Sequence, residues 1–333
     1  MNEKEKRLAA WCRARGVDGV WLRRRTNIAW LTDGADVHVD SSSSTGIASL
    51  LWTSKKKIAY TTNIEGPRLA AEELPGWEIH ETPWWKRSSA PEGNYANDHP
   101  DDPFADLRSP LTALELQRVR ALGKAGAEAL RGVMTWAKRG MSEHEIAGEL
   151  AGRLRKDGIF APVLLVAADE RIARFRHPIP TAARVRKTFM VALCPRQHGL
   201  MVAMTRLAHF GKLSPDLRRR HDAVCRVDAA LHAATAVGRR WCDILGAGID
   251  AYRAEGFGEE WKLHHQGGPV GYEGREFKAT PTETRKVVKN QLVGWNPSIA
   301  GTKSEDTILS SGEPLTSTRG WPSCGGRPDI LVR

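Results

Sequence analysis

The chain has 333 residues, of which 41% are hydrophobic and 27% charged, and its formal net charge is +11 at pH 7. This composition excludes a disordered, collagen-like or coiled-coil chain and supplies enough apolar residues for a folded core. The sequence contains no long apolar run and no secretory-type N-terminus, so we expect no membrane association and a cytoplasmic location.

Cysteines and basic residues do not form recognisable binding motifs. The five cysteines are widely spaced and include no CxxC pair, which predicts neither a disulfide framework nor a structural zinc site. Basic residues occur in short, dispersed runs such as Arg23–Arg25 and Lys55–Lys57. We interpret these runs as solvated surface and expect no nucleic-acid partner.

The first part of the chain, residues 1–108, alternates helical and strand-like patterns. Residues 3–15 and 66–74 have helical patterns, and the β-rich runs at 17–22, 47–53, 57–62 and 77–82 predict strands. These patterns predict a small α/β domain. Residues from about 86 to 110 are rich in Pro, Asp, Asn and Ser, which predicts an interdomain linker.

Residues 111–333 repeat an order of helices followed by strands, which predicts an α+β domain with two similar halves. Capping boxes at Thr112/Glu115 and at Ser142/Glu145 predict the starts of two of the helices. The predicted helices are 111–137, 145–158, 214–238 and 242–255, and the predicted strands are 162–168, 188–194, 199–206 and two short stretches around 291–299 and 305–309.

Several short motifs follow one another in this second part and in the first. They are GMSE (140–143), FRHP (175–178), GLMVAMTR (199–206), HHQGGPVGYEGRE (264–276), WNPSI (295–299), KSEDT (303–307) and, more weakly, RRRTNIAWLTD (23–33). In this order they resemble the motifs of the creatinase/aminopeptidase P/prolidase family. The resemblance implies a C-terminal pita-bread (creatinase-like) domain, a smaller α/β creatinase-type N-terminal domain, and a homodimer.

The resemblance also locates five metal ligands, and here this sequence departs from the family. The two aspartates fall at Ala192 and Ala203, the histidine at Gly268 and the first glutamate at Asn296, while Glu305 alone is kept. Divalent ions that prefer oxygen or imidazole donors find none on alanine or glycine. We therefore expect no metal ion and no other cofactor.

Polar residues nevertheless remain around the position of the lost metal site. A metal-independent relative, creatinase, hydrolyses a small C–N substrate with a pocket histidine as acid and base, and His177 falls at the position that resembles it. We therefore assign catalysis to His177, His264 and Glu305. Substrate binding is assigned to Arg206, His265, Gln266, Arg275, Glu276, Asn296, Lys303 and Asp306.

The function expected from these residues is metal-independent hydrolysis, or a lyase reaction, at a C–N bond of a small amino-acid-like, guanidino or amide substrate. The cationic members Arg206, Arg275 and Lys303 predict that the substrate carries a carboxylate. Hydrolysis of a non-peptide bond is favoured over peptidase activity.

Two alternatives stay open at this point. One is a metallopeptidase of the Xaa-Pro aminopeptidase or prolidase type that uses shifted ligands such as His264, His265 and Glu305. The other is an inactive binding module, like the peptidase-like domain of a histone chaperone, although a chain of charge +11 is poorly suited to a basic partner.

Overall fold

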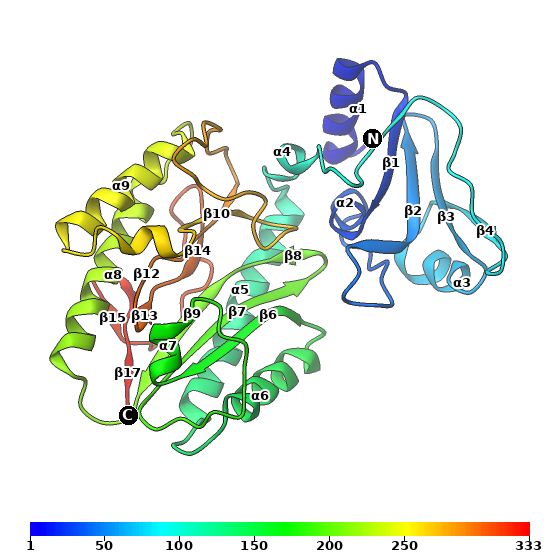
Figure 1. Ribbon diagram of the computed structural model, residues 1–333. Coiled ribbons are helices and arrows are strands. Elements are labelled where there is room, and N and C mark those ends of the chain that lie inside the picture. Colours follow the sequence, from blue (N-terminus) through cyan, green and yellow to red (C-terminus); the bar gives the residue numbers. More distant parts are fainter. The chain divides into compact units, whose positions relative to one another are not determined.

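The computed structural model describes all 333 residues, which form two compact units: Met1–Thr112 with His198–Leu200, and Ala113–Gln197 with Met201–Arg333 (Figure 1). Each unit is described separately. In neither unit is a helix both long and apolar enough to cross a membrane.

The first unit is a five-stranded mixed sheet with helices. The strand order is β4-β3-β2-β1-β5, with antiparallel pairs in the centre and a parallel pair at each edge. Its elements are α1 (Glu3–Arg15), β1 (Gly19–Arg24), α2 (Arg25–Leu31), β2 (Thr45–Thr53), β3 (Lys57–Thr62), α3 (Gly66–Arg68), a π-helical turn (Leu69–Glu73), β4 (Glu78–Thr82), β5 (Tyr95–Asn97) and α4 (Ala105–Arg108).

Helix α1 shows how local sequence determines an element in this unit. The Asn2 side chain accepts from the backbone N–H of Glu5, whose carboxylate in turn accepts from the backbone N–H of Asn2. At the other end Gly16 adopts a left-handed conformation, with φ +66°, and ends the helix. Leu8 and Cys12 lie on the buried side of the helix.

The segment predicted to be a linker is more ordered than its composition suggests. Strand β5 and helix α4 both lie within residues 86–110. The buried Asp98 holds this segment to the sheet, since its carboxylate accepts from the backbone N–H groups of Arg23 at 2.8 Å and Arg24 at 3.0 Å and from the Asn27 amide at 2.9 Å. The sequence pattern misses these contacts because every partner lies about 70 residues away in the chain.

The second unit contains the longer helices and most of the strands. Its elements are α5 (Ala113–Trp136), α6 (Glu143–Lys156), β6 (Phe160–Ala168), α7 (Glu170–Arg174), β7 (Thr188–Gln197), β8 (Leu200–Met201), β9 (Met204–His209), α8 (Pro215–Ala234), α9 (Trp241–Ala254), a 3₁₀ turn (Glu260–Leu263), β10 (Gly267–Val270), β11 (Leu292–Trp295), β12 (Ser298–Ile299), β13 (Thr302–Lys303), β14 (Asp306–Leu309), β15 (Ser323–Cys324), β16 (Arg327–Pro328) and β17 (Leu331–Val332).

This unit has the two-half α+β arrangement that the helix and strand patterns predict. In one half α5 and α6 accompany the antiparallel strands β6, β7 and β9, with β17 added at the edge. In the other half α8 and α9 precede the antiparallel strands β10, β11 and β14 (Figure 1). The capping box of Ser142 and Glu145 starts α6, as the sequence predicts. Ser214 caps α8, and Pro215 lies in its first turn.

Candidate functional site

Strand pairing in the second unit connects three of the five positions that the resemblance gives to metal ligands. Ala192 on β7 lies opposite Thr205 on β9, and Thr205 forms a bridge with Glu305, directly before β14. Gly268 on β10 lies opposite Gly294 on β11, which in turn pairs with β14. These three positions therefore lie on linked strands.

The residues at these positions do not fit a pair of metal ions. Glu305 is the only carboxylate among them, and its oxygens already have partners. Oε2 lies 2.8 Å from the Lys303 ammonium and accepts from the Thr205 hydroxyl at 2.6 Å, and Oε1 lies 3.2 Å from the Arg275 guanidinium. Two side-chain cations thus balance the one carboxylate that remains.

These cations set the protonation state of Glu305. Burial by itself would raise the pKa of this carboxyl, but Lys303 and Arg275 reverse the effect and lower its pKa from 4.5 to about 2. Glu305 is therefore ionised throughout the neutral range and holds both cations in place.

Gly268 lies where the resemblance locates the metal-binding histidine. Its backbone has φ +151°, and a Cβ atom added there would lie 2.4 Å from the carbonyl oxygen of Phe277. The backbone of this strand consequently has no room for a side chain at Gly268.

Three histidines form a second group close to Glu305. Nε2 of His177, which follows α7, lies 3.0 Å from Nε2 of His264, so that one ring donates a hydrogen bond to the other. The His265 ring stacks on His264 with centroids 4.4 Å apart. Nδ1 of His264 and Nδ1 of His265 are buried without a hydrogen-bond partner.

All three rings are held in the neutral form. Burial and then the charge of Lys303 lower the pKa of His264 to about 2, and burial and then Arg275 lower that of His265 to about 4. The same combination of burial and Lys303 lowers the pKa of His177 below its usual value of 6.5. At neutral pH these rings are therefore uncharged and can accept a proton.

A cavity of about 290 Å³ lies beside His264 and His265. Its polar lining includes His264, His265 and Lys278, and apolar side chains supply much of the rest. The size suits a small molecule rather than a long peptide. The apolar lining residues are Leu245, Trp261, Leu263, Ala279 and Pro281.

The structure separates some of the residues that the sequence groups together. Arg206 and Asp306 pair with each other at 2.9 Å, on a different face of their strands from Glu305. Side chains of consecutive strand residues point to opposite faces, so Glu305 and its neighbour Asp306 cannot serve one site. Arg206 and Asp306 are thus placed away from the histidines.

Three further predicted residues have structural partners. Gln266 donates to the carbonyl of His264 at 2.5 Å and accepts from the Tyr252 hydroxyl at 2.8 Å, which orients the loop that carries the histidines. Glu276 accepts from the backbone N–H of Tyr272 at 3.0 Å. Asn296 is buried, and its side-chain oxygen has no hydrogen-bond partner.

Two residues that touch this region are absent from the sequence-based assignment. Thr205 donates to Glu305, and its place directly before Arg206 in the GLMVAMTR motif is the signal that could have identified it. Lys278 lines the cavity beside the histidines. It lies two residues beyond the quoted motif, and no pattern in the sequence distinguishes it from other surface lysines.

Comparisons with known proteins agree with the arrangement of the strands. Residues 117–313, more than half of the chain, match the model of metallopeptidase family M24. No curated protein matches this chain in sequence.

Solved structures with the same fold include a prolidase, an X-Pro aminopeptidase and a domain of a FACT complex subunit. A prolidase from Pyrococcus horikoshii OT3 superposes with a TM-score of 0.79 at 17% identity, covering 96% of this chain and 99% of that one. An X-Pro aminopeptidase from Thermotoga maritima MSB8 gives 0.76 at 17% identity over 100% of both chains. The N-terminal domain of the FACT complex subunit SPT16 from Cicer arietinum gives 0.71 at 11% identity, covering 97% of this chain and 96% of that one. At these identities the likeness establishes the fold.

Proposed function

The chain belongs to metallopeptidase family M24, and from that premise we propose that it is a hydrolase of a C–N bond in a small, carboxylate-bearing molecule, working without the family's pair of metal ions. The observation that carries the proposal is the pair formed by His177 and His264, whose Nε2 atoms are 3.0 Å apart beside a carboxylate already neutralised by two cations.

The histidine pair supplies a route for the proton. A neutral ring of lowered pKa accepts a proton from water as the oxygen attacks a carbon bonded to nitrogen. The same proton then passes to the departing nitrogen, so that water is the only co-reactant and the ring returns to its neutral form. The hydrogen bond between His177 and His264 fixes the direction in which the active ring points.

The charges around the histidines favour an anionic substrate. Lys303, Arg275 and Lys278 all lower the pKa of His177, while Glu305 alone raises it. The local balance of charge is therefore positive. A substrate carboxylate is attracted to such a site, and its apolar part fits the cavity beside His264 and His265.

The proposal is tested with a panel of N-acetyl, N-carbamoyl and N-amidino amino acids, assayed for release of amine or ammonia with and without EDTA. We expect turnover of at least one member, unchanged by EDTA. His177→Gln and His264→Gln should each lower kcat about 100-fold or more, which is the usual contribution of a general acid or base. His144→Gln changes an exposed histidine on α6 and serves as the matched control.

Turnover that survives both substitutions, or that EDTA abolishes, would contradict the proposed mechanism. Absence of turnover across the panel, together with absence of bound metal, would favour the binding-module alternative.

A specific observation supports one second candidate, a metal-dependent peptidase with shifted ligands. The ring nitrogens of His177, His264 and His265 lie within 4.8 Å of one another, a separation that one ion could bridge. Glu305 does not fit this set because both of its oxygens have other partners. Stoichiometric zinc, cobalt or manganese after incubation and gel filtration, with metal-dependent cleavage of Xaa-Pro dipeptides, would establish this candidate in place of the first.

A further inference from the structure

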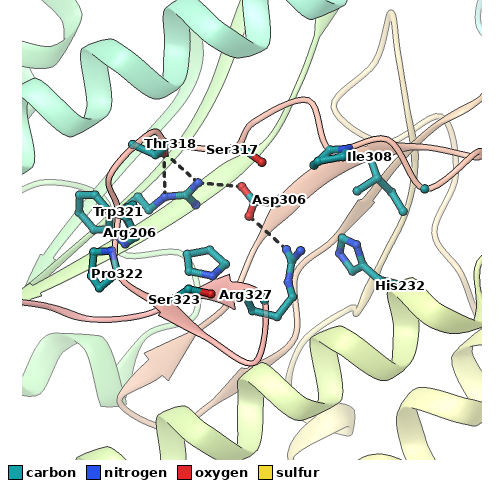
Figure 2. Close-up of a pocket in the computed structure, with 14 residues that line it drawn as sticks. Arg206, His232, Asp306, Ile308, Ser317, Thr318, Trp321, Pro322, Ser323 and Arg327 are labelled. Atoms are coloured by element: carbon teal, nitrogen blue, oxygen red, sulfur yellow. Dashed lines mark hydrogen bonds and ion pairs between the residues drawn. The ribbon is translucent and has the colours of Figure 1, made fainter.

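A second cavity lies on the face of the strands that Asp306 occupies, away from Glu305 and the histidines. Its volume is about 290 Å³, enough for a small metabolite. Figure 2 shows Arg206, Asp306 and Arg327 linked across it by ion pairs, with His232 of α8 on the far side of Arg327. The sequence grouped Arg206 and Asp306 with the substrate-binding residues, but the hydrolase proposed above does not use this cavity.

The carboxylates around this cavity are fully neutralised. Asp306 pairs through Oδ1 with Arg206 at 2.9 Å and through Oδ2 with Arg327 at 3.1 Å. Asp228 pairs through Oδ2 with Arg327 at 2.7 Å and through Oδ1 with His232 at 3.1 Å. Two aspartates and two arginines balance, so no uncompensated negative charge repels an anion.

Ion pairing keeps this buried network ionised and rigid. Burial alone would raise the pKa of Asp228, but Arg327 and then His232 hold it below the ordinary value. Arg206 is 1% exposed and donates to Asp306, to the Thr316 carbonyl at 2.8 Å and to the Thr318 hydroxyl at 3.0 Å. Its guanidinium is therefore held in place and serves as scaffold rather than as a free donor.

The polar groups at the cavity that have no protein partner are mainly hydrogen-bond donors. Arg327 uses Nε for Asp228 and Nη2 for Asp306, which leaves Nη1 without a protein partner. The hydroxyls of Ser317 and Ser323 line the cavity and are exposed.

A guanidinium held by two carboxylates presents its remaining N–H groups in one direction, which is how arginine binds oxyanions. From this geometry we propose that the cavity binds a small molecule through an oxyanion group, a carboxylate or a phosphate, on Nη1 of Arg327 and the hydroxyls of Ser317 and Ser323. The Trp321 ring and Ile308 also line the cavity and suit the carbon skeleton of such a ligand.

Isothermal titration of the full chain with sodium phosphate and, separately, sodium succinate tests the proposal, with sodium chloride at matched ionic strength as the blank. We expect saturable binding at one site per chain for at least one of the two anions. Binding of phosphate alone identifies a phosphate ligand, and binding of succinate alone identifies a carboxylate ligand.

Two variants locate the site. Arg327→Lys keeps the charge but loses the forked geometry, and the double variant Ser317→Ala/Ser323→Ala removes both hydroxyls while leaving the ion pairs of Arg327 intact. Each should weaken binding ten-fold or more. Arg226→Lys, which changes a surface arginine paired with Glu255, is the matched control and should bind like the parent chain.

If Arg327→Lys does not fold, as judged by near-ultraviolet circular dichroism, the double serine variant decides the question. Absence of saturable binding for both anions would overturn the proposal. Equal affinity in the parent chain and the double serine variant would do the same, because binding would then lie elsewhere. Neither outcome bears on the histidine pair of the proposed hydrolase.

Discussion

Replacing Lys303 by methionine tests whether Lys303 and Arg275 stabilise the buried carboxylate of Glu305. Lys303 lies 2.8 Å from Glu305, and both side chains are more than nine-tenths buried. The substitution keeps most of the side-chain volume but leaves the carboxylate with Arg275 and Thr205 alone. A buried carboxylate that has lost its nearest cation is destabilising because its desolvation is no longer offset.

The magnitude follows from the pKa of Glu305. Its fall from 4.5 to about 2 corresponds to about 3 kcal/mol of stability. Because the folded-state pKa is the lower one, this contribution is present above pH 4.5 and is lost as the pH falls from 4.5 towards 2. Since Lys303 is the largest cause that lowers the pKa, we expect the substitution to reduce the free energy of unfolding at pH 7 by roughly 2–4 kcal/mol.

Urea unfolding at pH 7, followed by circular dichroism and tryptophan fluorescence, measures this loss. The double variant Lys303→Met/Glu305→Gln should recover much of the stability, because no buried charge is then left without its main partner. Lys262→Met removes the lysine of an exposed pair with Glu259, 2.6 Å apart, and should change stability by less than about 1 kcal/mol. A loss below about 1 kcal/mol for Lys303→Met, or no recovery in the double variant, would refute the argument.

Three other predictions follow from the same structure. Because the pKa of His177 is lowered, kcat/KM of the proposed reaction should rise with pH through a value below 6.5 and be level above pH 7; a profile still rising at pH 8 would exclude this ring as the base. Gly268→His should not restore metal binding and should lower the free energy of unfolding by several kcal/mol, because its Cβ would meet the Phe277 carbonyl at 2.4 Å; stoichiometric manganese with an unchanged Tm would contradict this. Asn2→Ala removes the cap of α1 and should lower the free energy of unfolding, measured with urea, by about 1 kcal/mol. No change would show that the cap is frayed in solution.

Much of the secondary structure and the family could be predicted from sequence because their signals are local. Ser142 and Glu145 cap a helix within one turn, and Pro215 starts another, so neighbouring residues contain the whole signal. The motifs are equally short, and their order sufficed to predict the pita-bread fold that the family match and the solved structures confirm.

The candidate site was only partly predictable for the opposite reason. The resemblance brought His177 and His264 to one place, and the structure sets their Nε2 atoms 3.0 Å apart. Arg206 and Asp306 were grouped with them but lie on the other face, which the adjacency of Glu305 and Asp306 on one strand could have indicated.

Only the tertiary structure decided which residues far apart in the sequence contact one another. The resemblance predicts that Glu305 is the one family metal ligand kept, but not that Arg275, 30 residues earlier, and Thr205, 100 residues earlier, bind its two oxygens. It shows a polar segment before residue 110, but not that Asp98 ties it to the first sheet. Helix caps and strand patterns depend on residues a few positions apart, whereas the charge state of a buried group depends on whichever residues the fold brings within a few ångströms.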